Sequence, residues 1–354
     1  MRVASSGRPG RPAAAGRSAG ERRTALSGRR GPWRAARRAT VVLGLTAGIA
    51  LAVSACETAD EPSPGRSTTA TQVDVPDFDG ARAHAHIERQ VGFGPRAPGS
   101  SGHAEQLAWM EAFLRERADT VVLQPFDHTA KSGEVVRMSN VFASFRPDAR
   151  DRILLVTHWD TRPTADMDPD PKRKTEPILG ANDGGSGTAV LLELADVLSR
   201  HSPPIGVDLL FTDGEDYGPG EMYLGATHFA ANPVPGPGYR PLYGILVDMV
   251  GDRRPVFPIE YHSYQYAPEV VERVWRAAED AGYRHIFVRR HGGAIEDDHI
   301  PLNRAGIRTI DIIDFDYGPG NAYWHTTSDV LENTAPDGLE AVGKVILRLI
   351  FQGG

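Results

Sequence analysis

Short apolar segments alternate with segments of helical spacing over most of this chain, and this alternation limits the folds that it can adopt. The expected strands are Val121–Phe126, Asn140–Phe145, Ile153–Val156, Val207–Thr212, Tyr243–Met249, Ile286–Arg289 and Thr309–Ile313. The expected helices are Ala81–Val91, Gly102–Arg117, Gly187–Arg200, Met222–Ala231, Ala267–Ala281 and Pro336–Phe351. Uniformly apolar strands separated by helices are typical of parallel sheets that are buried on both faces. We therefore expect an α/β fold, a single domain with a mostly parallel central sheet flanked by helices on both faces.

The first 55 residues differ in composition from the rest of the chain. They contain eleven arginines and one acidic residue, and they end in an uncharged run of 17 residues, Ala39–Ala55. A basic segment followed by an apolar run and small residues is typical of a secretory signal, and a membrane-spanning helix needs about 20 residues. We interpret residues 1–55 as a lipoprotein signal peptide, although a plain signal anchor would share this pattern.

Cys56 directly follows the apolar run and is the only cysteine of the chain, which excludes an intramolecular disulfide. The sequence Val53-Ser54-Ala55-Cys56 resembles a bacterial lipobox, in which the cysteine is acylated and becomes the mature amino terminus. Residues 56–77 are rich in Pro, Ser, Thr and acids and are expected to form a disordered tether. Residues 78–354 are then one large folded domain, and the protein is expected to be exported and lipid-anchored to the cell membrane, facing outside the cytoplasm.

The charge of the chain argues against one class of partner. Without residues 1–55, 28 basic and 45 acidic residues remain, a net charge of −17. Nucleic acids and anionic membrane surfaces are bound through basic patches. We therefore expect no nucleic-acid partner.

Polar residues that can bind metals follow the expected strands. In open α/β sheets, ligands bind beyond the carboxyl ends of the strands, and five such ends carry acids or histidines: His158, Asp183, Glu215 with Asp216, Asp248 and His325. Each has a simpler explanation when taken alone, since Asp183 could be a helix N-cap and His325 a structural histidine. Together they favour a zinc site with nitrogen and oxygen ligands, because the domain contains no thiol.

These residues lie in motifs that resemble those of the zinc-dependent glutaminyl-peptide cyclotransferases, which share the fold of the di-zinc aminopeptidases. The resemblance extends from about Gln90 to Phe351, in family order, over Val91–Ser100, His158–Asp160, Gly180–Asp183, Asp213–Asp216, Asp248, Asp297–Pro301 and Trp324–Thr326. The block Asp297-Asp298-His299-Ile300-Pro301 together with Trp324-His325-Thr326 resembles the cyclases more than the peptidases.

The resemblance implies a role for each site residue. Asp183, Asp216 and His325 would bind one Zn²⁺, Glu215 would be the general acid and base, and Asp248 with Asp297 would form a hydrogen-bonded acidic pair beside the metal. Trp324 would wall the substrate pocket, and Asp311 would lie near it, where the animal enzymes have a histidine. The animal enzymes also have glutamate where this chain has Asp216. The implied substrates are peptides and proteins with an amino-terminal glutamine, which would be cyclised with release of ammonia.

Two other functions fit the same residues. A di-zinc aminopeptidase would use His158 and Asp248 to hold a second zinc, with Asp183 bridging the two ions and Glu215 activating a water. A non-catalytic lipoprotein that binds peptides or metal would be expected to have lost the base or a ligand, and this chain has kept all of them. The cyclase is the preferred hypothesis, and Asp297 is the residue that separates it from the aminopeptidase.

Overall fold

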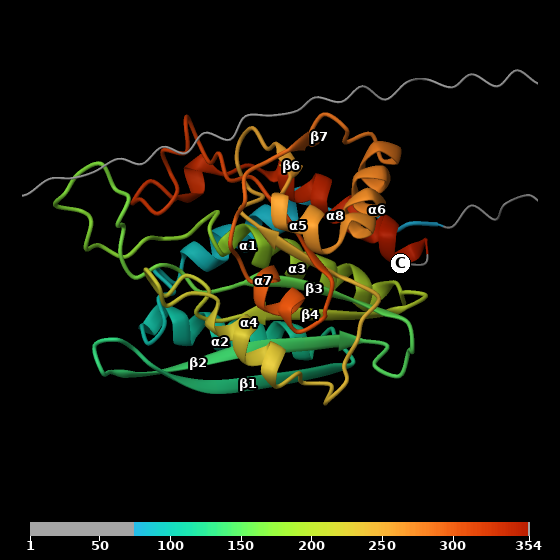
Figure 1. The fold of residues 1–354 in the computed structure, drawn as a ribbon, viewed down its shortest axis with the longest axis horizontal. Coiled ribbons are helices and arrows are strands. Elements are labelled where there is room, and N and C mark those ends of the chain that lie inside the picture. Colours follow the sequence, from blue (N-terminus) through green and yellow to red (C-terminus); the bar gives the residue numbers. More distant parts are fainter. Residues whose placement is uncertain (1–73, 353–354) are drawn as a thin grey trace, which may run out of the picture. The chain divides into compact units, whose positions relative to one another are not determined.

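The central element of the fold is a mixed sheet of six strands (Figure 1). The computed structural model describes residues 74–352, so the predicted signal peptide, Cys56 and most of the predicted tether lie outside the described residues. The strand order is β1-β2-β4-β3-β5-β8. The strands are β1 (Thr120–Thr129), β2 (Val135–Phe145), β3 (Arg152–His158), β4 (Gly206–Thr212), β5 (Gly244–Asp248) and β8 (Thr309–Ile313).

The four strands at one end of this order are parallel to one another, and the other two are attached to them in antiparallel fashion. β3 pairs in parallel with β4 and β5, and β5 pairs in parallel with β8. β2 is antiparallel to β4 and to β1. All four parallel strands are fully buried apart from the first residue of β3. This burial explains why their sequences are almost uninterrupted apolar runs.

Helices cover both faces of the sheet. They are α1 (Gly80–Val91), α2 (Ser101–Arg115), α3 (Gly185–Arg200), α4 (Leu224–Ala231), α5 (Tyr261–Tyr266), α6 (Pro268–Asp280), α7 (His299–Arg304) and α8 (Pro336–Phe351). Along β3, Ile153 and Leu155 belong to the larger core with α1, α3 and α8, whereas Leu154 and Val156 belong to the smaller core with α4 and α7. Successive side chains of a strand point to opposite faces, so the alternation demonstrates two covered faces. The expected α/β architecture is confirmed.

Three details differ from the sequence-based expectation. The expected strand at Ile286–Arg289 exists as β7 (Phe287–His291), but it pairs with the unexpected β6 (Phe257–Ile259) in a separate two-stranded sheet. The helices α5 and α7 were also not expected. Each has only six residues, too few for hydrophobic periodicity to reveal. α5 begins where the Glu260 carboxylate accepts hydrogen bonds from the amides of His262 and Ser263, which is a capping interaction. Within residues 74–352, no helix combines the length and the apolar character that crossing a membrane requires.

The start of α3 packs directly on the end of the sheet. A Cβ atom added to Gly187 would collide with the carbonyl oxygen of Val247 and with the hydroxyl of Thr157. Both contacts are made by strand residues of β5 and β3, and the obstructing carbonyl belongs to the rigid backbone. The glycine therefore sets how closely α3 approaches the strand ends.

We expect Gly187→Ala to destabilise the fold by about 1–3 kcal/mol, the usual cost of overpacking a well-packed core. Urea unfolding followed by circular dichroism measures this change. Gly293→Ala is the matched control, because nothing lies within 4 Å of an added Cβ at Gly293. Equal stability of the two variants would show that the approach of α3 is not limited at Gly187.

Candidate metal centre

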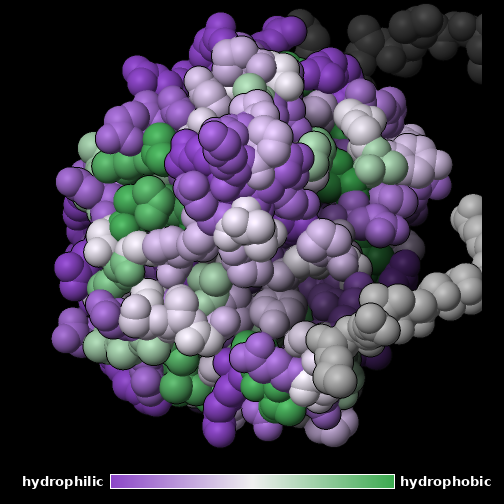
Figure 2. All heavy atoms as spheres, turned by 90° about the vertical axis from the view of Figure 1, so that its left-hand side faces the viewer, coloured by the Kyte–Doolittle hydropathy of each residue, from purple (hydrophilic) through white to green (hydrophobic). Residues whose placement is uncertain are grey.

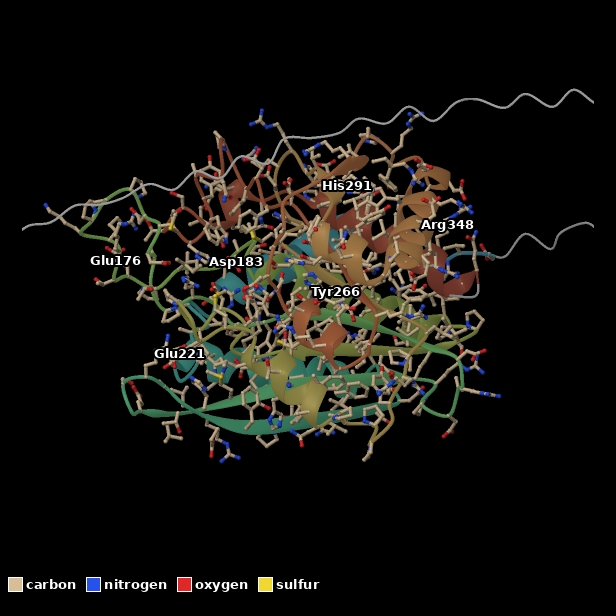
Figure 3. The ribbon with its side chains drawn as sticks, in the orientation of Figure 1. Glu176, Asp183, Glu221, Tyr266, His291 and Arg348 are labelled. Atoms are coloured by element: carbon tan, nitrogen blue, oxygen red, sulfur yellow. The ribbon has the colours of Figure 1, made fainter. Side chains whose placement is uncertain are left out.

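A cavity of about 390 Å³ opens at the carboxyl ends of the parallel strands. Its lining comes from the last residues of β5 and β8 and from the segments that follow β3, β4, β5, β7 and β8: Arg162, Asp183, Glu215, Pro219, Met222, Tyr223, Asp248, Met249, Ala294, Ile295, Glu296, Asp297, Ile313, Phe315, Trp324 and His325. Figure 3 shows Asp183 well inside the fold, whereas Glu176 and Glu221 lie at the periphery on the same side. Seen from that side, the surface is mainly hydrophilic and its hydrophobic residues form small separate groups (Figure 2).

Asp183, Asp216 and His325 come together as the sequence predicted, and two of them, Asp183 and His325, line this cavity. The His325 Nε2 atom lies 3.5 Å from Asp183 Oδ2 and 3.4 Å from Asp216 Oδ2. Zinc ligands at about 2.0–2.1 Å in tetrahedral geometry are separated from one another by about 3.3 Å. The buried Asp216 Oδ2 has no hydrogen-bond partner, and a buried carboxylate oxygen needs one. Both observations fit a metal ion bound by these three side chains.

A second group shares Asp183 with the first. His158 Nε2 lies 3.2 Å from Asp183 Oδ1 and 3.1 Å from Asp248 Oδ1. The two oxygens of Asp183 therefore face different histidines, one in each group. This arrangement fits two metal ions bridged by Asp183 as well as it fits one ion in the first group.

The two histidines differ in their charge. Burial lowers the pKa of His325 to about 4, which leaves the imidazole neutral, the form that binds metals. Burial also acts against the charged form of His158, but the carboxylates of Asp248, Asp160 and Asp183 raise its pKa well above its usual value. In the absence of a metal ion, a protonated His158 thus balances the negative charge of the carboxylates in the second group.

Glu215 and Asp297 lie beside the two groups and line the same cavity. Burial, followed by the negative charge of Asp297, raises the pKa of Glu215 well above its usual value. Burial and then the charge of Asp248 have the same effect on the pKa of Asp297. Within the described residues no hydrogen bond joins Asp248 to Asp297; Asp248 instead bonds to His158. The two carboxyl groups therefore interact through their charges, without the hydrogen bond that the resemblance implied.

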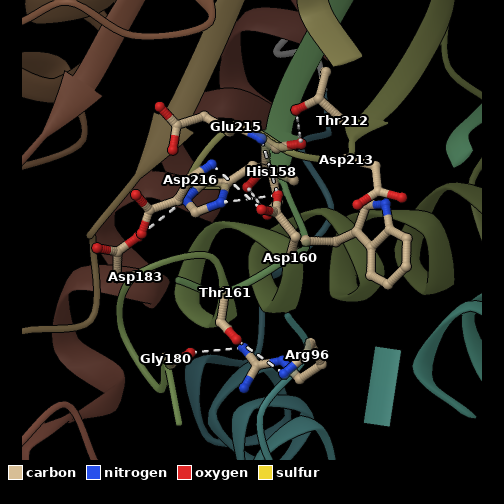
Figure 4. Close-up of polar contacts among 12 residues, drawn as sticks. Arg96, His158, Asp160, Thr161, Gly180, Asp183, Thr212, Asp213, Glu215 and Asp216 are labelled. Carbon is tan, nitrogen blue, oxygen red and sulfur yellow. Dashed lines mark hydrogen bonds and ion pairs between the residues drawn. The ribbon is translucent and has the colours of Figure 1, made fainter. Parts of the chain in front are cut away.

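Two further carboxylates hold the backbone turns that carry the predicted ligands. Asp160 accepts hydrogen bonds from the amides of Glu215 and Asp216, at 3.1 and 3.3 Å (Figure 4). Asp329 accepts them from the amides of Asn182 and Asp183, at 2.8 and 3.1 Å. Both carboxyl groups are fully buried, so these turns are fixed by hydrogen bonds that water does not compete for.

Sequence reasoning missed Asp329 and also Arg96. Arg96 is fully buried, and its guanidinium donates to the carbonyl oxygens of Leu179 and Gly180, just before Asp183. Its backbone amide donates to the Thr161 hydroxyl (Figure 4). Asp329 lies four residues after His325 in the same short turn, and this proximity was the signal that could have revealed it.

Arg162 is a third residue that sequence reasoning missed, and it lines the cavity. Its guanidinium pairs with Asp216 Oδ1 and, at 2.7 Å, with Asp166 Oδ1. Asp166 in turn lies 3.7 Å from His325 Nδ1. Arg162 and Asp166 therefore link two of the predicted zinc ligands, Asp216 and His325, through a chain of ion pairs.

The predicted pocket residues have different outcomes. Trp324 lines the cavity, and its ring stacks on His325 at 3.8 Å between centroids. Asp311 does not line it, and the expectation that it lies near the substrate pocket stays a prediction. Asp311 precedes Ile313 by two residues in β8, so both side chains point to one face, but only Ile313 reaches the cavity. Asp311 is fully buried, its two carboxyl oxygens have no partner, and burial raises its pKa well above the usual value.

Comparison with known proteins places this arrangement in a family. Residues 140–350 match the model of peptidase family M28. The chain belongs to peptidase family M28. Among solved structures of relatives, the Bacteroides thetaiotaomicron glutaminyl cyclase bound to N-acetylhistamine has a TM-score of 0.76 and 38% sequence identity, covering 79% of this chain and all of that one. The Tannerella forsythia glutaminyl cyclase has a TM-score of 0.75 and 41% identity over the same shares of the two chains.

Other relatives extend this result. A mouse glutaminyl-peptide cyclotransferase-like protein is 28% identical over 279 residues, covering 71% of this chain and 70% of its own. A zinc-dependent exopeptidase from Parabacteroides distasonis has a TM-score of 0.76 and 39% identity, covering 78% of this chain and 99% of that one. The resemblance to glutaminyl-peptide cyclotransferases is thus confirmed. Overall similarity to the zinc-dependent exopeptidase is equally high.

We expect Asp329→Asn in this M28 protein to weaken zinc binding by about 10–100-fold, the usual effect of removing a group that orients a metal ligand. The amide cannot accept from both the Asn182 and Asp183 backbone, so Asp183 loses its fixed position. Competition with a chromogenic chelator measures the affinity.

Two tyrosine variants provide the comparison. Tyr317→Phe removes the 3.0 Å hydrogen bond from the Tyr317 hydroxyl to Asp329, and we expect a smaller loss of zinc affinity. Tyr239→Phe removes an equivalent 2.6 Å bond to Asp208, near the other end of β4, and should leave zinc binding unchanged. Parental zinc affinity in Asp329→Asn would refute a positioning role for Asp329.

Proposed function

We propose that this protein is a zinc-dependent glutaminyl cyclase that converts the amino-terminal glutamine of peptides and proteins to pyroglutamate. The observation that carries the proposal is the convergence of Asp183, Asp216 and His325 at ligand-to-ligand distances, with Glu215 and Asp297 in the same cavity. The glutaminyl cyclases among the relatives support the same activity.

The reaction needs an amine nucleophile, a polarised amide and a route for protons. A zinc ion held by Asp183, Asp216 and His325 would supply Lewis-acid polarisation of the glutamine side-chain carbonyl. The α-amine of the substrate attacks that carbonyl carbon, a five-membered lactam forms, and the side-chain nitrogen leaves as ammonia. Because the substrate provides its own nucleophile, no water is activated.

Glu215 is suited to move the proton in this reaction. It lines the cavity, and its backbone amide is held by Asp160 at 3.1 Å. Glu215 takes a proton from the attacking amine and returns it to the departing nitrogen, the role of a general acid–base group. A buried carboxyl with a raised pKa holds and releases a proton near neutrality more readily than an exposed one.

The neighbouring side chains shape the rest of the site. Trp324 forms an aromatic wall beside the His325 ring, where the methylene groups of a glutamine side chain can pack. Asp248 is bonded to His158, and Asp297 next to it carries a raised pKa. A neutral Asp297 can donate a hydrogen bond to the substrate, whereas an ionised one could only accept.

An aminopeptidase is the second candidate function. The group His158, Asp183 and Asp248 has the spacing of a second metal site, and the Parabacteroides distasonis relative is described as a zinc-dependent exopeptidase. In that case two zinc ions would be bound, and Glu215 would act on a water instead of an amine.

A single assay separates the two functions. We expect a Gln-Phe-Gly amide to yield one ammonia and one pyroglutamyl peptide per turnover, measured by ammonia coupling and mass spectrometry, with one zinc per chain by elemental analysis. Glu215→Gln should retain zinc and lower kcat by at least about 10²-fold, the size of general acid–base effects. Free glutamine and a shortened peptide without ammonia would contradict the cyclase and support the aminopeptidase.

We further propose that the enzyme is exported and attached to the membrane through a lipid on Cys56. The basic leader, the apolar run Ala39–Ala55 and the single cysteine support this location. We expect Cys56→Ser to move the protein from the membrane to the soluble fraction, as judged by fractionation and immunoblotting. Ser54→Thr offers a control that keeps the cysteine, and continued membrane retention of Cys56→Ser would contradict the anchor.

A further inference from the structure

A second hollow of about 360 Å³ adjoins the catalytic cavity. The two share four lining residues, Ala294, Ile295, Ile313 and Phe315. These residues come from the segment before Asp297 and from the end of β8, and they form a common wall between the two spaces. Ala294 and Phe315 are exposed, so a chain leaving the cavity over this wall enters the second hollow.

A series of aromatic rings leads from the predicted metal site to this wall. The His325 ring stacks on Trp324 at 3.8 Å, and Trp324 meets Phe315 at 4.9 Å with an interplanar angle of 57°. The Phe315 side chain is 36% exposed. An extended peptide bound at the zinc ligands can therefore continue along a nonpolar path.

The deep acids of the second hollow are already satisfied by the protein itself. Glu260 accepts hydrogen bonds from the amides of His262, Ser263 and Ile295. Asp314 accepts from the amides of Val256 and Asp316. Carboxylates that are occupied in this way do not need a ligand. The other lining residues include the apolar Pro258, Ile295 and Phe315, and the exposed Asp316. The hollow is thus suited to an apolar side chain.

Arg290 stands at the rim of the hollow. It is exposed and has no ion-pair partner within residues 74–352, whereas its neighbour Arg289 pairs with Glu272 and Glu279 on α6. Of these two arginines, Arg290 lines the hollow and Arg289 does not. An arginine guanidinium can stack on an aromatic ring and donate to peptide carbonyl groups.

We propose that the second hollow is the subsite for the residues that follow the amino-terminal glutamine, and that it selects an aromatic or large apolar side chain. The inference rests on the proposed cyclase activity and names its substrate class: peptides whose second or third residue is aromatic. Arg290 and Phe315, which both line the hollow, would contact that side chain without taking part in the chemistry.

The test compares short and extended substrates. We expect Gln-Phe-Gly amide or Gln-Gly-Phe amide to have at least a 5-fold higher kcat/KM than Gln-Gly-Gly amide, with the gain in KM. Turnover of glutamine amide, which is too short to reach the hollow, tests the cyclase itself. If glutamine amide is cyclised but all three peptides have equal kcat/KM, the subsite is wrong while the cyclase stands.

Three variants locate the effect. Gly293→Phe places a ring in the hollow at a position where nothing lies within 4 Å of an added Cβ, and it should abolish the preference for phenylalanine. Arg290→Ala should reduce the preference at least 2-fold, whereas Arg289→Ala should leave it unchanged. All three should cyclise glutamine amide at the parental rate. A preference that survives in Gly293→Phe would overturn the assignment of this hollow.

Discussion

Mutual repulsion among buried carboxyl groups is the constraint on which the rest of this structure depends. Asp183, Asp216, Glu215, Asp248 and Asp297 line or adjoin one cavity, and each is at least nine-tenths buried. Like charges in such an environment cannot all remain ionised without cations or donors. The protein provides Arg162 at Asp216, an imidazolium at Asp248 and backbone amides at the supporting acids. A bound zinc ion would supply the positive charge that this set still lacks.

Part of this centre could be predicted from the sequence because of a simple topological rule. Strands that run in parallel end at the same edge of a sheet, so acids and histidines after β3, β4 and β5 had to meet. His325, which comes from a turn after β8, meets them as the motif implied. The prediction needed only the type of each residue and its position after a strand.

The supporting residues could not be predicted in this way. Asp329 and Arg96 act on backbone amides and carbonyls near Asp183, and such partners leave no pattern of side-chain types in a sequence. The burial of Asp311 could not be predicted for a different reason: the comparison with a family histidine indicated that the residue lies near the pocket, but not that its side chain is fully buried and absent from the cavity lining. The pairing of β7 with β6 was missed because the three residues of β6 carry no usable periodicity.

Asp183 presents one carboxylate oxygen to each of two histidines, and this geometry has a consequence for how the family can diversify. The second group, His158, Asp183 and Asp248, can hold either a proton or a divalent metal ion with little rearrangement, because the distances between its nitrogen and oxygen atoms suit both. Evolution between lactam formation and peptide hydrolysis would then require no new ligand. It would require only a change in neighbouring residues, such as Asp297, that determine whether the second group holds a proton or a metal ion.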